Sequence, residues 1–374
     1  MFYDEGFTVL KDRLDEELVV GASLTMSCFC YSIFRLDPYI GCQHSCSYCY
    51  TRFLPGYRRS FKAIANYARL LRAALESWRS SGVPLPPFRL SALTDPFPPI
   101  EEKLGIALEV MKVARKLGIP LIVCTKSTLI AREPWLSIVK ELAGEGLAIV
   151  QLSVAFLNDE VARKLEKGAP PPSERFKAAE KLADEQIPVV LRLQPLIPYL
   201  NSSAEFLEEY ADAARSVGAR HVILEVLRIL RWRDLECFRV AMPKFDFVKL
   251  TNPALWEPYP WGAHKHPGKG WRRSIYELAI ETLSRRGLTV GLCREGFFDL
   301  NAAPDCCGIY LLRERVVRVT LREQFYGFQS GYRYIQLEDV ERLPLPAVKR
   351  KLRKHFQLVY EVLANKELLQ KIIG

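Results

Sequence analysis

The chain has 374 residues, 49% of them apolar, which is enough for one domain of about 200–250 residues and a smaller second unit. A formal net charge of +10 indicates a polyanionic partner or an anionic surface. No apolar run reaches the length of about 18 residues that a membrane helix needs, and the acidic N-terminal stretch lacks the pattern of a signal peptide. We therefore expect a cytoplasmic protein without a membrane partner.

Three cysteines lie close together in the stretch PYIGCQHSCSYCYT, residues 38–51: Cys42, Cys46 and Cys49 in the spacing C-x3-C-x2-C. Three thiolates are one ligand short of a closed zinc site or a four-cysteine iron–sulfur site. In a [4Fe–4S] cluster held in this way, one iron stays open to a small-molecule ligand. The alternative is a zinc site in which His44, inside the same loop, is the fourth ligand.

Hydrophobic periodicity predicts a helix over residues 60–80, after which short apolar runs alternate with amphipathic segments. The expected strands are 88–93, 121–125, 147–156, 188–196 and 221–227. The expected helices are 101–116, 134–142, 173–184 and 203–216. Continuously apolar strands joined by helices indicate a parallel sheet covered by helices.

With the segment before Cys42 counted as the first strand, the pattern has six β/α units. Right-handed crossovers then favour an α/β fold, a partial (β/α)6 barrel of the TIM type. The loops at the carboxyl ends of the strands carry the chemistry of such barrels, which places the Cys42–Cys49 loop at the mouth. An open doubly wound sheet is the competing architecture.

Beyond the last predicted barrel strand the pattern changes. We expect a helix over 274–284, strands over 309–312 and 316–321, and two helices within 345–374. The predicted division is an N-terminal extension at 1–35, a barrel at 36–235 and a C-terminal α+β region at 236–374 that closes the barrel.

Five stretches, in matching order, resemble one known family. They are LDPYIGCQHSCSYCYTR, SALTDPFPPIEE, VCTKSTLIARE, LSVAFLNDEVARKLEKGAPPPSERFKAAEKL and RLQPLIPYLN, and they cover residues 36–201. They are similar to the spore photoproduct lyase-like branch of the radical S-adenosylmethionine (SAM) superfamily, also described as DNA repair photolyase-related. The resemblance implies a radical SAM enzyme with a [4Fe–4S] cluster and SAM as cofactors.

In this family SAM binds the open iron and is cleaved reductively to a 5′-deoxyadenosyl radical, which abstracts hydrogen from the substrate. The resemblance implies that the cluster ligands are Cys42, Cys46 and Cys49. It implies a SAM-binding role for Tyr48, Thr94, Asp95, Lys126, Ser153 and Arg192. Thr94 and Asp95 would receive the methionine amino group, Lys126 would face the carboxylate as a point charge, and Ser153 would reach the ribose or the carboxylate.

One position departs from the family pattern. The hydrogen-donating cysteine of the lyase stands beside the Thr-Asp pair, and here that position is Leu93. A leucine cannot return a hydrogen atom, so repair of thymine dimers is in doubt for this chain. Cys124, on the neighbouring predicted strand, is a substitute donor or a small core residue.

A second group of thiols is a candidate for an auxiliary metal site: Cys28, Cys30, Cys293, Cys306 and Cys307. A second iron–sulfur cluster, a zinc site and buried inert thiols are the alternatives. Irregular cysteine spacing in a long chain favours metal ligation over a disulfide scaffold.

Two basic stretches support a nucleic-acid partner. KRKLRKHF at 349–356 places five cations within six positions, and TRFLPGYRRSFK at 51–62 interleaves cations with aromatic residues. We expect DNA or tRNA as the substrate and ferredoxin or flavodoxin as the electron donor. The alternatives are radical modification of a peptide, lipid or metabolite, and a non-catalytic zinc or iron–sulfur protein that binds nucleic acid.

Overall fold

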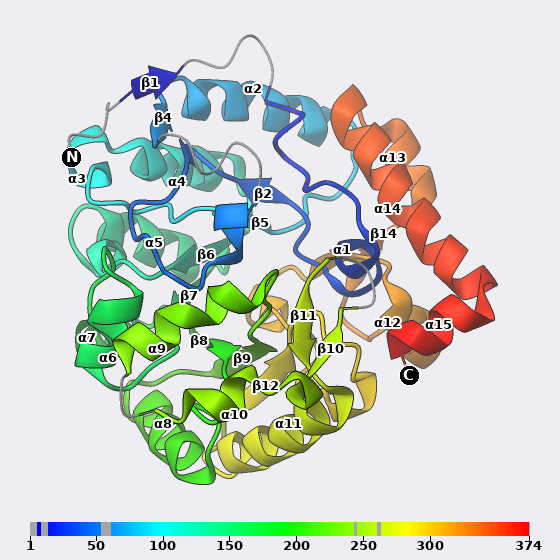
Figure 1. The fold of residues 1–374 in the computed structure, drawn as a ribbon. Helices are drawn as coiled ribbons and strands as arrows, with labels where there is room; N and C mark the ends of the chain where they lie inside the picture. Colours follow the sequence, from blue (N-terminus) through cyan, green and yellow to red (C-terminus); the bar gives the residue numbers. More distant parts are fainter. Residues whose placement is uncertain (1–5, 9–13, 54–60, 243–244, 260–262, 374) are drawn as a thin grey trace.

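The computed structural model describes residues 6–8, 14–53, 61–242, 245–259 and 263–373. Its centre is a sheet of seven parallel strands in the spatial order β12-β9-β8-β7-β6-β5-β2 (Figure 1). These strands are β2 (Arg35–Leu36), β5 (Phe88–Leu90), β6 (Leu121–Thr125), β7 (Ala148–Ser153), β8 (Val189–Leu196), β9 (His221–Val226) and β12 (Thr289–Leu292). Because spatial order follows chain order, every crossover runs in the same direction and the sheet curves into a partial barrel. The predicted fold class is confirmed.

Helices that follow the strands cover the outer face of the sheet (Figure 1). They are α2 (Tyr67–Ser80), α4 (Ile106–Leu117), α5 (Trp135–Gly144), α7 (Pro172–Asp184), α8 (Ala204–Ser216) and α11 (Lys269–Ser284). Their apolar faces enter one continuous core with the strands, as in α8, where Leu207, Tyr210 and Ala214 are buried. The Ser203 hydroxyl accepts the Phe206 N–H at 3.1 Å and caps the start of α8.

Smaller elements surround this frame. The remaining helices are α1 (Leu24–Phe29), α3 (Glu101–Leu104), α6 (Asp159–Leu165), α9 (Glu236–Ala241), α10 (Phe247–Thr251), α12 (Leu321–Tyr326), α13 (Leu337–Arg342), α14 (Pro346–Ala364) and α15 (Lys366–Ile373). The remaining strands are β1 (Gly6–Thr8), β3 (Tyr39–Ile40), β4 (Lys62–Ile64), β10 (Trp256–Pro258), β11 (Lys265–Pro267), β13 (Val316–Arg318) and β14 (Arg333–Ile335).

Several predicted elements differ from the structure. The helix expected over 60–80 begins only at Tyr67, because residues 62–64 form strand β4 beside β3. The helix expected over 101–116 is divided at Gly105, whose φ of 62° lies in the left-handed region that glycine adopts freely. The strand expected over 309–312 is a 3-10 turn at Ile309–Leu311. Helix α6 was not predicted.

The seventh strand also went unpredicted, and it comes from the C-terminal region. β12 pairs with β9 along four residues from Thr289 to Leu292. Residues 305–312 of the same region fill the inside of the barrel, where Cys306, Cys307 and Ile309 pack against Ile122 and Ile149. The C-terminal region therefore supplies both an edge strand and part of the interior; the boundary at residue 235 stays a prediction.

In the part of the chain that the structure describes, no helix combines the length and apolar character required to cross a bilayer.

Candidate functional site

The cysteine loop lies at the carboxyl end of β2, at the mouth of the barrel. Cys42, Cys46 and Cys49 are partly exposed and form no disulfide. Burial is the main cause of the raised pKa of Cys46, and the nearby thiols of Cys42 and Cys49 add to it. The thiol of Cys46 therefore lies within electrostatic range of the other two. The Cys49 Sγ lies 3.0 Å from the Thr51 hydroxyl.

The chemistry of the three thiols fits the ligands of a [4Fe–4S] cluster. Among the described residues, no three His, Cys, Asp or Glu side chains converge closely enough to share one metal ion. In a [4Fe–4S] cluster the thiolates bind different irons, so its ligands need not converge on one point. Three adjacent but separate thiols are therefore the donor set that a three-cysteine cluster requires.

His44 is turned away from the thiols. Its Nδ1 lies 2.9 Å from the Gly168 carbonyl oxygen, and its Nε2 lies 3.1 Å from Asp95 Oδ2. Burial alone would lower the pKa of His44, but Asp95 and the Gly168 carbonyl raise it overall. With both ring nitrogens engaged, the structure does not offer His44 as the fourth ligand of a zinc site.

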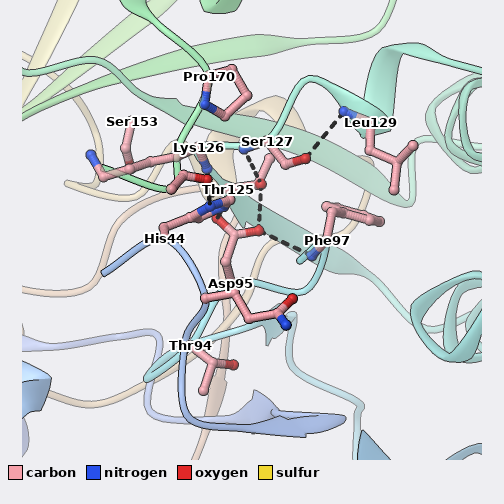
Figure 2. A network of polar contacts seen from close by, with 12 residues as sticks. His44, Thr94, Asp95, Phe97, Thr125, Lys126, Ser127, Leu129, Ser153 and Pro170 are labelled. Carbon is pink, nitrogen blue, oxygen red and sulfur yellow. Dashed lines mark hydrogen bonds and ion pairs between the residues drawn. The ribbon is translucent and has the colours of Figure 1, made fainter. Parts of the chain in front are cut away.

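Asp95 is the centre of a polar network that joins the ends of three strands (Figure 2). Besides His44, its carboxylate accepts the Thr125 hydroxyl at 2.7 Å, the Lys126 N–H at 2.7 Å and the Phe97 N–H at 3.0 Å. Burial would raise the pKa of Asp95, but His44, the Lys126 N–H and the Thr125 hydroxyl lower it. Asp95 thus fixes the cysteine loop relative to the end of β6.

A backbone pairing holds the loop from the other side. Ser47 N donates to Leu165 O at 2.7 Å, Gly168 N donates to His44 O at 2.9 Å, and Cys46 forms an isolated antiparallel bridge with Glu166. The segment 165–168 thus adds a short strand-like edge to the cysteine loop.

Glu166 is the charged centre of this contact. Its fully buried carboxylate pairs with Lys126 Nζ at 2.9 Å and accepts hydrogen bonds from Arg175 and from the Tyr48 hydroxyl. Burial would raise the pKa of Glu166, but Lys126 and Arg175 lower it to about 2. A carboxylate with two cationic partners is the condition under which a buried charge is tolerated. Sequence reasoning missed Glu166, Gly168 and Arg175.

The other predicted SAM-binding residues lie at the mouth of the barrel or just inside it. The Tyr48 ring stacks on Phe238 at a centroid distance of 6.4 Å. Thr94 Oγ1 lies 3.2 Å from Ser91 Oγ and 3.5 Å from Asp37 Oδ1. Ser153 and Arg192 are register partners on β7 and β8. These roles stay predictions, although the residues do share one end of the barrel.

Arg192 and Cys124 belong to a polar layer inside the barrel. Arg192 Nη1 donates to Gln151 Oε1 at 2.8 Å and lies 3.9 Å from Cys124 Sγ. Cys124 also contacts Gln151 Oε1, at 2.9 Å, and accepts from Arg89. Cys124 is partly exposed in the interior, on the strand that ends in Thr125.

The second group of thiols separates into two. Cys30, Cys293, Cys306 and Cys307 lie within electrostatic range of one another in the barrel interior. Cys28 instead packs with apolar residues of α12, α14 and α15. The auxiliary metal site stays a prediction.

Arg89 contributes a positive charge to the interior thiols. Its Nη2 lies 3.6 Å from Cys307 Sγ. The contact from Cys306, with the sulfurs 3.8 Å apart, and the charge of Arg89 lower the pKa of Cys307 to about 6 against the effect of burial.

The structure describes the two basic stretches, 349–356 and 51–62, to different extents. In 349–356, four of the five cations contact Glu16 or Glu341: Lys349, Arg350, Lys351 and Arg353. Lys349 contacts only the backbone carbonyl of Glu341, so two carboxylates compensate part of the charge of this stretch. In 51–62, residues 54–60 lie outside the described residues.

Fold and site together define a class of protein: a partial parallel barrel with three cysteines on the loop after its first strand, of the kind found in radical SAM domains. Residues 36–211 match the family described as the Radical SAM superfamily. Residues 36–211 therefore form a radical SAM domain.

The relatives found by sequence are uncharacterized proteins of Mycobacterium bovis and Mycobacterium tuberculosis, each 28% identical over 200 residues. The match covers 50% of this chain and 57% of each relative, so the chain spans little more than half of their length.

Among solved structures, spore photoproduct lyase complexed with dinucleoside spore photoproduct aligns with a TM-score of 0.56 at 15% identity. The alignment covers 76% of this chain and 81% of the lyase. A lyase variant with bound AdoMet and dinucleoside spore photoproduct aligns with the same TM-score and coverage. At this identity the likeness establishes the shared fold.

Proposed function

We propose that the chain is a radical SAM enzyme that modifies or repairs a nucleic acid. The observation that carries this proposal is the three-thiol loop at the barrel mouth, where both ring nitrogens of His44 are engaged by Gly168 and Asp95. When bound, the [4Fe–4S] cluster supplies the electron that cleaves SAM to methionine and a 5′-deoxyadenosyl radical, which abstracts hydrogen from the substrate.

The protein's own residues would bind and orient the cofactors. Cys42, Cys46 and Cys49 would hold the cluster, and the pairing of the loop with residues 165–168 would fix its position. Thr94 and Lys126 would receive the amino and carboxylate ends of SAM. Asp95 would act by holding the backbone of Lys126, to which its carboxylate is bound at 2.7 Å.

We also propose roles for other residues near the inside of the barrel. We assign Ser153 to the ribose or the carboxylate of SAM, and Tyr48 to support of the loop through Glu166. Cys124 is the candidate hydrogen donor, because it lies inside the barrel and Leu93 occupies the position of the family's donor.

We further propose that the substrate is a nucleic acid. Two observations support this substrate class: the net charge of +10, and a fold shared with a lyase whose structure was solved with a dinucleoside photoproduct. A base in a duplex would have to leave its stack to reach the barrel. Ferredoxin or flavodoxin is the proposed electron donor. Peptide, lipid or metabolite modification is the alternative substrate class.

Anaerobic reconstitution with iron and sulfide tests the activity. We expect about four irons per chain for one cluster, and formation of 5′-deoxyadenosine from SAM after reduction by dithionite. Cys42→Ala should lose both. Cys237→Ala is the matched control, since this thiol lies on α9 and donates to Asp234 O at 3.3 Å. A protein that holds only zinc and makes no 5′-deoxyadenosine would refute the proposal.

A further inference from the structure

Three arginines gather around one carboxylate beside the last three barrel strands. Arg294, after β12, pairs with Glu225 Oε1 at 2.6 Å, and Arg228, after β9, pairs with the same oxygen at 3.0 Å. The charge of Arg192, on β8, also acts on Glu225. A group of partly buried cations with so few acidic partners favours binding of an anion.

The neighbouring carboxylates do not neutralise the excess positive charge of these arginines. Glu295 pairs mainly with Arg272, at 2.9 Å, and lies 3.6 Å from Arg228. Arg272 pairs in turn with Glu257 at 2.9 Å. Four guanidiniums thus share three carboxylates.

Arg192 is the member of the group with the weakest compensation. Its hydrogen bonds go to the neutral amides of Gln151 and Gln194. The Nε2 of Gln194 is itself buried without a hydrogen-bond partner. A cation and an unsatisfied N–H donor therefore lie together inside the barrel, and both would be satisfied by an oxyanion.

Arg294 carries a second, independent sign of function. Its φ of 61° lies in the left-handed region, which residues with a side chain rarely adopt. Backbone conformations of this kind cost free energy and are concentrated at functional sites. The Arg294 side chain is 18% exposed, so its charge is partly desolvated and still reachable by a ligand.

An exposed aromatic ring lies beside these charges. Tyr50 directly follows Cys49, is 41% exposed and donates to Ala92 O at 3.4 Å. It lies within electrostatic range of Arg192, Glu225 and Arg294. Guanidiniums that bind phosphate next to an aromatic ring that stacks on a base are the usual means of holding an unpaired nucleotide.

We infer that Arg192 and Arg294 bind a phosphate of an unpaired nucleotide unit at the barrel mouth, and that the Tyr50 ring stacks on its base. This inference rests on the proposed function and specifies its substrate class. A carboxylate of a peptide is the competing anion, and the experiment separates the two.

Fluorescence anisotropy of labelled hexathymidylate, measured on the reconstituted protein without SAM, tests the inference. Arg294→Gln should weaken binding about tenfold or more, the effect of losing a hydrogen bond to a charged group. Hexathymidylate with neutral methylphosphonate linkages should bind wild type more weakly by a similar factor. Arg353→Gln is the control, because Arg353 is 52% exposed on α14 and pairs with Glu341. This control should change binding by no more than about twofold.

Arg192→Gln is a second variant that should fold normally, because the hydrogen-bond partners of Arg192 are neutral and its loss leaves no carboxylate unpaired. It should also weaken binding, with an unfolding midpoint near that of wild type. Equal binding by wild type and both variants, or equal binding of the neutral oligonucleotide, would overturn the inference. Displacement of the oligonucleotide by N-acetyl-dialanine but not by inorganic phosphate would assign the site to a carboxylate instead.

The result of this binding experiment does not depend on the test of the proposed function. That test measures 5′-deoxyadenosine formation by wild type without nucleic acid, whereas this one measures nucleotide binding without SAM.

Discussion

Gly168 shows how closely the segment 165–168 packs against the cysteine loop. A Cβ atom at this position would lie 2.3 Å from the Gln43 carbonyl oxygen and 3.0 Å from the His44 Cα. Both are backbone atoms, so neither can yield unless the loop itself moves. The absence of a side chain at this residue is therefore a condition for the observed position of the thiols.

We expect Gly168→Ala to displace the cysteine loop, to reduce the iron bound after reconstitution, and to cost about 1–3 kcal/mol of unfolding free energy, as overpacking does. Iron content and the denaturant midpoint of the metal-free protein measure the two effects. Gly144→Ala is the matched control, since a Cβ on Gly144 meets nothing within 4 Å. If both variants bound iron and unfolded like wild type, the loop would not depend on this contact.

Glu166 shows what the sequence could not reveal at the residue scale. The spacing of Cys42, Cys46 and Cys49 is local and predicted the loop directly. The pairing of Glu166 with Lys126 joins residues 40 positions apart, and its contact with Tyr48 spans 118 positions. No periodicity or spacing signals such a pair; only the fold brings these residues together.

At the scale of elements, burial and length decided which predictions succeeded. The run 121–125 was predicted as a strand from its apolar residues, and it is β6 with the same bounds. β12 is only four residues long and contains Gly291, whose absent side chain leaves room for the Cys306 backbone. A short strand with a glycine carries too little pattern to be recognised, although it completes the sheet.

Helix α14 is joined to the N-terminal extension through a buried histidine. His355 Nδ1 lies 2.8 Å from the Ser27 hydroxyl, and its Nε2 lies 3.1 Å from the Val20 carbonyl oxygen. Burial, with a smaller contribution from the charge of Arg318, lowers the pKa of His355 from 6.5 to about 3. The histidine is therefore neutral in the folded protein through most of the acid range.

This shift predicts a pH dependence of stability. Between pH 6.5 and 3 the unfolded chain binds a proton at this residue that the folded protein does not, so stability falls as the pH falls. The contribution of His355 at pH 5 is a loss of about 2 kcal/mol relative to neutral pH. In His355→Gln the free energy of unfolding should decline less steeply between pH 7 and pH 5, by about this amount. Parallel profiles for variant and wild type would contradict the prediction.

At the scale of the whole molecule, residues 14–30 pack against the C-terminal region. Arg318, the fully buried last residue of β13, donates to the carbonyl oxygens of Cys30 at 3.0 Å and Met26 at 2.8 Å. These carbonyls lie in the last turn and at the C-cap of α1, so one guanidinium adds a hydrogen-bond donor to the end of this helix. α1 lies beside α14, which runs along one side of the barrel (Figure 1).

This packing predicts how the chain tolerates truncation. A chain of residues 1–235 would lack β12 and would leave the edge of β9 unpaired. It would also lose the segment with Cys306 and Ile309, and so expose Ile122 and Ile149 inside the barrel. We expect this chain to aggregate or to unfold without a cooperative transition, because both an unpaired edge and exposed core favour association.

A chain that ends at residue 364 is the control. It lacks only α15, of which Ile372 is the one residue buried among those described, so it should keep a single cooperative transition at a lower midpoint. Circular dichroism during thermal unfolding, with sedimentation to detect aggregates, distinguishes the two chains. A reversible cooperative transition of the 1–235 chain would show that the barrel folds alone and that residues 236–374 are an independent addition.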